Sequence, residues 1–151
     1  MSGGEVYRYS MKLYGEIEMK QMLMIVVASV LVWGCNDILT NQYPYGEEFT
    51  LEYQKSALVG GESLVRFIGV KEDLRCPTDA TCVWEGNAAA EFSIKVSGFP
   101  AQRFVLNTYS EKDQEMTING VTVRLISVAP DPVTTRQIRP DEYSVRIVVQ
   151  R

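Results

Sequence analysis

Apolar and polar residues alternate in short runs along the chain from Phe49 onward. The runs 88–96 and 143–150 place apolar side chains at every second position. A period of two is typical of β-strands that bury one face. The segment 64–70 is apolar at most positions, which predicts a strand in the middle of a sheet. Runs of these kinds predict strands at 49–54, 64–70, 88–96, 104–106, 121–128 and 143–150.

Turn signals separate these runs. Asn119-Gly120 precedes the run 121–128, and this dipeptide is the strongest short-range signal for a β-hairpin because both residues tolerate positive φ. No segment after residue 36 shows a helical period. The pattern therefore predicts an all-β fold, either an antiparallel β-sandwich (Ig-like) or a small barrel, with about seven or eight strands.

The N-terminal region follows a different pattern. Residues 22–33 form a run that is apolar apart from Ser29 and begins two positions after Lys20. The run is shorter than the roughly 20 residues of a membrane-spanning helix but fits the apolar core of a signal peptide. It ends in Val32-Trp33-Gly34-Cys35, which resembles a bacterial lipobox. We therefore predict that Cys35 carries a lipid, while a buried helix, ordinary signal cleavage and an uncleaved anchor remain alternatives.

The position of this run suggests how the chain is organised. Residues 1–18 carry three acidic side chains where a signal peptide should be positive, so we expect that the start codon is mis-assigned and that the natural start is Met19 or Met11. The predicted parts are a leader at 1–34, a lipidated cysteine with a polar tether at 35–48, and a β-sandwich domain at 49–151. The predicted location is the bacterial cell envelope, with the membrane contacted through the lipid on Cys35.

The net charge of the chain argues against one class of partner. The chain has a formal net charge of −4, and residues 1–35 carry three acids and three bases. The negative charge therefore belongs to the remainder of the chain, which has no cluster of Lys and Arg. This argues against nucleic acid as a partner and leaves the lipid as the only predicted membrane contact.

Cysteine usage agrees with export. Once Cys35 is assigned to the lipid, Cys76 and Cys82 remain as a pair. An oxidising compartment would join them in a disulfide. A metal site built on the two thiols is the alternative, but the chain contains no histidine to complete it. No cofactor is expected.

The segment 72–88 is the densest motif of the chain. Its structural interpretation is a tight connection in which Trp84 lies over the disulfide or caps the core. Its functional interpretation is an exposed binding loop formed by Arg75, Trp84, Glu85 and Asn87. A Ca²⁺ site is a weaker hypothesis, resting on the following four acids: Glu72, Asp73, Asp79 and Glu85.

This segment also carries a resemblance to a known family. Arg75-Cys76-Pro77, Cys82-Val83-Trp84, Gly86 and Ala88 resemble the "SRCP…CVWAGxA" segment of a family of small exported bacterial lipoproteins of the Bacteroidetes type. Leu74 stands where the family usually has Ser, and Glu85 where it usually has Ala. The resemblance covers about residues 47–150 and implies an exported lipoprotein. The family has no established activity, so the resemblance implies no substrate.

The absence of histidine excludes the common nucleophilic triads, and we expect that the protein is not an enzyme. The favoured function is a non-catalytic binding or interaction domain held at the envelope, with an envelope protein or glycan as partner. The alternative is a protease-inhibitor-like or protective accessory protein that acts through its loops, with the Pro-rich segment 129–140 as the inserting wedge.

Overall fold

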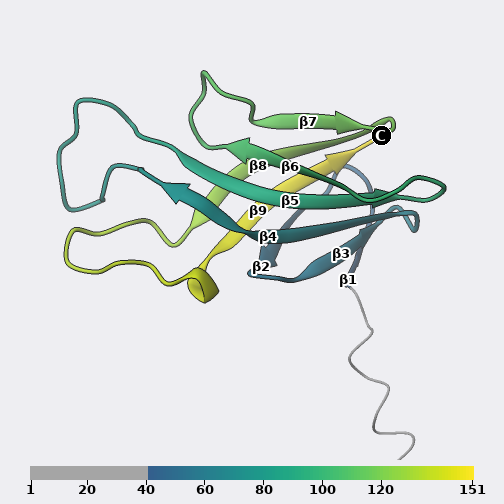
Figure 1. Cartoon of the computed structure of the whole chain (residues 1–151), viewed down its shortest axis with the longest axis horizontal. Coiled ribbons are helices and arrows are strands. Elements are labelled where there is room, and N and C mark those ends of the chain that lie inside the picture. The colour runs from purple at the N-terminus through teal and green to yellow at the C-terminus, as the bar shows by residue number, and fades with distance from the viewer. Residues whose placement is uncertain (1–40) are drawn as a thin grey trace, which may run out of the picture. The chain divides into compact units, whose positions relative to one another are not determined.

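The computed structural model describes residues 41–151, which form two β-sheets and one turn of 3₁₀ helix (Figure 1). The predicted leader and Cys35 lie outside the described residues. The strands are β1 (Asn41–Tyr43), β2 (Glu48–Glu52), β3 (Ser56–Val59), β4 (Ser63–Asp73), β5 (Ala88–Val96), β6 (Gln102–Asn107), β7 (Glu115–Ile118), β8 (Val121–Ala129) and β9 (Ser144–Gln150). The 3₁₀ helix η2 (Pro140–Glu142) precedes β9. No helix among these residues is long and apolar enough to cross a membrane.

The two sheets have different sizes. One contains five strands in the order β1-β3-β4-β5-β6, and the other contains four in the order β2-β9-β8-β7. All neighbouring strands run antiparallel except β1, which is parallel to β3. The sheets do not close into a barrel, so the structure confirms the all-β prediction and selects the sandwich.

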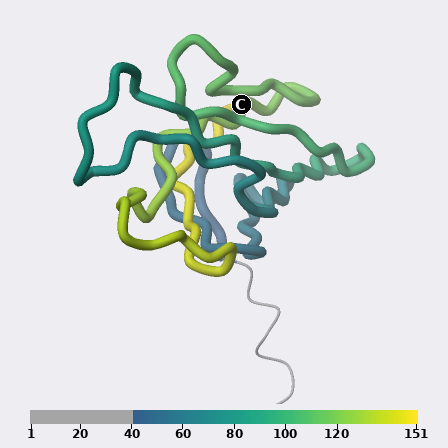
Figure 2. The backbone as a smooth tube through the Cα atoms, turned by 60° about the vertical axis from the view of Figure 1, so that its left-hand side comes forward, coloured from purple at the N-terminus to yellow at the C-terminus, as the bar shows by residue number. Residues whose placement is uncertain are grey.

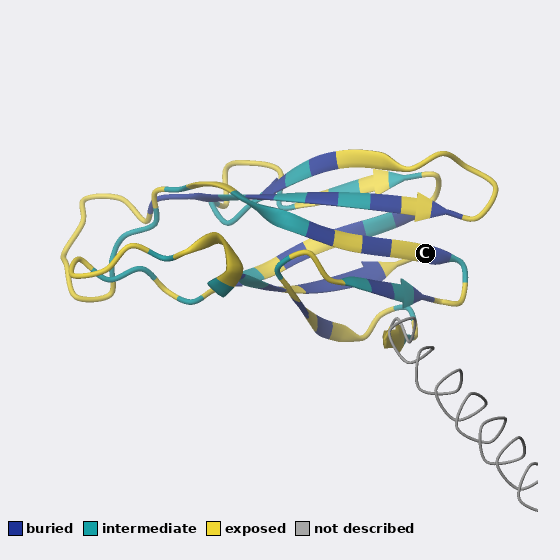
Figure 3. Ribbon diagram, turned by 60° about the horizontal axis from the view of Figure 1, so that its bottom comes forward, coloured by how far each residue is buried: buried dark blue, intermediate teal, exposed yellow. Residues whose placement is uncertain are grey.

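The core lies between the sheets, and strands such as β2 and β5 bury every second side chain in it (Figure 3). Phe67, Phe92 and Phe104 come from neighbouring strands of the larger sheet and form an aromatic row, with ring centroids 5.7 and 5.6 Å apart. Val123 and Ile147 are among the side chains that the smaller sheet contributes to the same core. The alternation seen in the sequence is thus the alternation of buried and outward-facing positions.

The hairpin prediction is confirmed. Asn119 and Gly120 have φ values of +51° and +78° and connect β7 to β8. Positive φ at both positions is the requirement of a type I′ turn, whose twist matches that of the flanking strands.

The predicted tether is too long at its C-terminal end. Residues 41–43 form β1, and the Tyr43 ring stacks on Phe49 with centroids 4.2 Å apart. The Tyr45 hydroxyl is 2.8 Å from the Ser63 hydroxyl, and the Gly46 amide donates to the Val149 carbonyl at 2.8 Å. Residues 41–48 therefore belong to the sandwich, because their aromatic rings and backbone groups find partners in both sheets.

Candidate functional site

Three loops lie at one end of the sandwich (Figure 1, left). The disulfide loop (residues 74–87) connects β4 to β5, the short loop (108–114) connects β6 to β7, and the Pro-rich loop (130–139) connects β8 to η2. The turned view in Figure 2 again shows the Pro-rich loop beneath the disulfide loop. Loops at one end of a sandwich are the usual place for binding surfaces, since the rigid sheets hold them in position.

The disulfide closes the tip of the disulfide loop. Cys76 and Cys82 are bonded, with their Cα atoms 5.9 Å apart, which is within the normal range for a disulfide. Below the tip the two arms remain paired, because the Leu74 amide donates to the Asn87 carbonyl at 2.7 Å and the Cys76 amide donates to the Glu85 carbonyl at 3.2 Å. The two cysteines are therefore used in a disulfide, as predicted, and not as a thiol pair for a metal.

Arg75 joins the disulfide loop to the Pro-rich loop. Its guanidinium donates to both carboxylate oxygens of Asp73, at 2.9 and 2.7 Å. It also donates to the carbonyls of Val128 at 2.5 Å and Pro130 at 2.8 Å. Its side chain is only 11% exposed. Arg75 was predicted to line an exposed binding loop, but the structure places it inside, where its donors satisfy buried acceptors.

Burial and the neighbouring Arg75 have opposite effects on the pKa of Asp73. Burial alone would raise the pKa of the Asp73 carboxyl, but the hydrogen bonds and positive charge of Arg75 outweigh burial and lower the pKa below its usual 3.8. The Tyr143 hydroxyl donates to the same carboxylate at 3.1 Å. Burial, together with the negative charge of Asp73, raises the pKa of Tyr143 to about 12. Asp73 is thus held as an anion and Tyr143 as a neutral donor.

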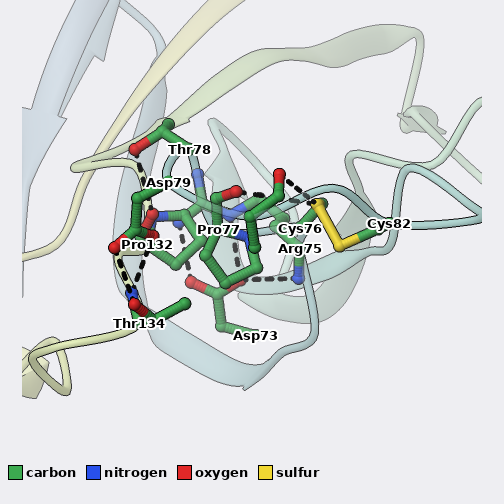
Figure 4. The surroundings of a disulfide bond; sticks show 10 residues. Asp73, Arg75, Cys76, Pro77, Thr78, Asp79, Cys82, Pro132 and Thr134 are labelled. Atoms are coloured by element: carbon green, nitrogen blue, oxygen red, sulfur yellow. Dashed lines mark hydrogen bonds and ion pairs between the residues drawn. A yellow bond between two sulfur atoms is a disulfide. The ribbon is translucent and has the colours of Figure 1, made fainter.

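A second link joins the same two loops nearer the tip. The Asp79 carboxylate accepts hydrogen bonds from the Thr134 amide at 2.9 Å and the Thr134 hydroxyl at 2.7 Å (Figure 4). The Thr78 amide donates to the Pro132 carbonyl at 2.9 Å. The Thr134 hydrogen bonds lower the pKa of Asp79. The Pro-rich loop, predicted as an inserting wedge, is hydrogen-bonded along the side of the disulfide loop.

Asn87 fixes the other side of the disulfide loop. It is only 4% exposed, and its amide donates to the Asn107 side-chain oxygen at 2.9 Å. Its own side-chain oxygen accepts from the Tyr109 amide at 3.1 Å. Like Arg75, it was predicted as a binding residue and is instead an internal contact. Glu85 is exposed, and its carboxylate accepts from the Ser110 amide at 3.4 Å.

Three apolar side chains of the disulfide loop face solvent. Val83 is fully exposed, Trp84 is 59% exposed and Leu74 is 53% exposed. We call Val83 and Trp84, which directly follow Cys82, the apolar tip; Leu74 lies on the paired arms below it. Trp84 therefore does not cap the core, which was one of the two positions that the structural interpretation allowed. Val83 and Leu74 were not predicted as binding residues, although the apolar pair after Cys82 was visible in the sequence.

The four acids considered as Ca²⁺ ligands do not form a group. Asp73 is bonded to Arg75, Asp79 to Thr134, and Glu85 to Ser110. Within residues 41–151, no three His, Cys, Asp or Glu side chains are placed to hold one metal ion.

Comparison with models of known protein families, with curated proteins and with solved structures finds no match to this chain.

Proposed function

We propose that the protein is an envelope lipoprotein whose β-sandwich is a non-catalytic binding module, with a protein as its partner at the apolar tip. The supporting observation is that Val83 and Trp84 stay exposed on a loop whose base is held on both sides. Aliphatic and aromatic side chains together are typical of protein contacts, where tryptophan is among the most frequent hot-spot residues.

The contacts below the tip favour binding in a second way. The disulfide, the Arg75 hydrogen bonds and the Asn87 hydrogen bonds hold the loop before any partner arrives. A loop that is already ordered loses little conformational entropy on binding, so more of the contact free energy remains as affinity.

Trp84→Ala is expected to abolish partner capture and leave stability unchanged. A photo-cross-linking amino acid placed at Val83 in native cells should yield one dominant protein adduct. Trp84→Ala, introduced into the protein that carries the cross-linker, should remove that adduct. Loss of a central tryptophan costs about 2 kcal/mol or more of binding free energy, or roughly 30-fold in affinity. The measurement is the yield of the adduct by immunoblot and mass spectrometry.

Phe99 provides the matched control. It is 50% exposed and lies in the connection from β5 to β6, at the other end of β5 from the disulfide loop. The cross-linker at position 99 should give no such adduct, and Phe99→Ala should leave the adduct from position 83 intact. An adduct that survives Trp84→Ala, or that forms equally from position 99, would refute the binding role of the apolar tip.

The lipid anchor is tested by the intact mass of the protein extracted from its native membrane. The expected mass is that of residues 35–151 with acyl chains attached, increased by two hydrogen atoms on reduction of the disulfide. Cys35→Ser should lose the acyl mass and membrane retention, because two or more chains are needed for stable anchoring. A full-length, unlipidated mass from native membranes would contradict this part of the proposal.

A further inference from the structure

The outer face of the five-stranded sheet carries two arginines in register. Arg66 of β4 is directly opposite Ser93 of β5, and Ser93 is directly opposite Arg103 of β6. Residues paired across antiparallel strands point to the same face of the sheet. Adjacent strands are about 4.8 Å apart, so the two arginine Cα atoms are about 10 Å apart with the Ser93 hydroxyl between them.

These three side chains line a pocket. Gln54 and Ile68 complete its wall, and its volume is about 270 Å³. The Gln54 side-chain oxygen accepts from the Arg66 guanidinium at 2.5 Å, and the Gln54 amide donates to the Ile68 carbonyl at 2.6 Å. Gln54 thus orients Arg66 through a neutral acceptor and leaves the positive charge of Arg66 uncompensated. We call this site the arginine pocket.

The two arginines of this pocket lack the ion pairs that the other arginines in the described part of the chain make. Residues 41–151 contain eight arginines, and six of them lie within ion-pair distance of a carboxylate. The six pairs are Arg75–Asp73, Arg124–Glu115, Arg136–Glu142, Arg139–Asp141, Arg146–Glu48 and Arg151–Glu62. Within the same residues, Arg66 and Arg103 have no such partner.

The surrounding face does not supply the missing negative charge. Glu91 lies two positions before Ser93 on the same face of β5, but its carboxylate is paired with Lys71 at 3.5 Å. Lys95 lies two positions after Ser93 and adds another positive charge. Two uncompensated arginines placed across one strand repel each other, and an anion bound between them would remove that repulsion.

We propose that the arginine pocket binds a phosphate or sulfate ester through Arg66, Arg103 and the Ser93 hydroxyl. Guanidinium groups offer several N–H donors in a plane and are the preferred ligands of such oxyanions. Donors arriving from three neighbouring strands suit a group whose acceptor oxygens point in at least three directions. A tetrahedral phosphate or sulfate ester offers this, whereas the two oxygens of a carboxylate lie in one plane. The site is independent of the apolar tip, since it lies on the face of the sheet.

Another hollow with cationic side chains is less suited to an anion. A cleft of about 380 Å³, lined by residues of β4 and the Pro-rich loop, includes Lys71 and Arg136. Lys71 is paired with Glu91, and Arg136 is paired with Glu142 at 2.6 Å. Its cations are therefore already neutralised by carboxylates of the protein, and the arginine pocket remains the favoured anion site.

The experiment is a titration of the full chain in neutral detergent, followed through the arginine Nε–Hε signals in ¹⁵N NMR spectra at constant ionic strength. The probes are inorganic phosphate, inorganic sulfate, glucose 6-phosphate, short-chain phosphatidate and acetate. Phosphate is expected to shift the Arg66 and Arg103 signals saturably, and acetate is expected to leave them unchanged. Phosphatidate binding more tightly than glucose 6-phosphate would identify a lipid headgroup as the source, and the reverse would identify a soluble ester.

Matched variants decide whether the pocket is responsible. Arg66→Gln and Arg103→Gln should each weaken phosphate binding roughly tenfold or more, because each removes a charge-assisted contact. Arg124→Gln makes the same change of charge at an exposed, paired arginine and should leave the affinity within about twofold. Absence of saturable shifts at Arg66 and Arg103, or equal weakening by Arg124→Gln, would overturn the proposal.

Discussion

Replacing Arg75 by methionine is expected to lower the free energy of unfolding by about 3–5 kcal/mol. The change leaves the Asp73 carboxylate, 10% exposed, without its cation, and it leaves the carbonyls of Val128 and Pro130 without a donor. Breaking a buried ion pair on one side is costly because the remaining charge stays out of water. Urea denaturation followed by circular dichroism measures the loss.

Two further variants test this explanation. Arg124→Met removes an arginine whose ion pair with Glu115 is half exposed, and it should cost less than about 1 kcal/mol. Asp73→Asn added to Arg75→Met should recover part of the loss, since no buried charge is then left uncompensated. Equal costs for Arg75→Met and Arg124→Met would show that the Arg75 contacts do not stabilise the fold.

The same contacts predict a dependence on acid. The folded pKa of Asp73 lies below its usual value of 3.8, so the unfolded chain binds the proton more readily. The stabilisation is therefore complete above that value and is lost as the pH falls through the folded pKa. In Arg75→Met this source of acid destabilisation disappears, because burial without Arg75 would raise the Asp73 pKa. Unfolding curves of both proteins between pH 5 and pH 2 provide the comparison.

Gly86→Ala is expected to lower the free energy of unfolding by about 3 kcal/mol or more. A Cβ atom at Gly86 would lie 2.0 Å from the Leu74 carbonyl oxygen and 2.7 Å from the Arg75 Cα, and both of these are backbone atoms. Gly86 also has a φ of +74°, which side-chain-bearing residues rarely adopt. The clash would separate the two arms of the disulfide loop, so the variant should also lose adduct formation from Val83. Urea denaturation and the cross-linking assay measure the two effects.

Gly98→Ala separates the steric clash of the added Cβ from the strain of a positive φ. Gly98 has a similar φ of +84°, but no heavy atom lies within 4 Å of its added Cβ. Only the backbone cost of about 1 kcal/mol should remain, and adduct formation should be unchanged. If the two alanine variants had equal stability, the close approach of Gly86 to Leu74 would not be the reason for the glycine.

The two sides of the disulfide loop explain why its tip can remain exposed. Arg75 holds one arm against the Pro-rich loop, and Asn87 holds the other arm against the short loop. With both arms fixed by polar contacts, Val83 and Trp84 contribute nothing to the core. Exposed apolar residues that the fold does not need are a liability for solubility, which supports a role for them in binding.

The sequence by itself determined the secondary structure of the larger strands, the Asn119-Gly120 hairpin and the cysteine pair. Each of these depends on local chemistry: a period of two buries one face of a strand, two residues that tolerate positive φ form a tight hairpin, and two cysteines form a disulfide under oxidising conditions. The all-β class followed from the absence of any helical period, and the two separate sheets of the structure then decided for the sandwich over the barrel.

Only the tertiary structure decided which residues of the motif face solvent. Arg75 and Trp84 both looked like binding residues in the sequence, but Arg75 finds its acceptors in residues 128–130, more than 50 positions away. The tether was also misjudged, because β1 becomes a strand only when β3 lies beside it.

The arginine pocket also could not be predicted from the sequence. Arg66 and Arg103 are 37 positions apart, and nothing in the alternation of either strand indicates that they share one neighbour. Their proximity depends on the register of three strands. Register is set by turns, bulges and packing across the whole sheet, so it cannot be read from any single segment of the chain.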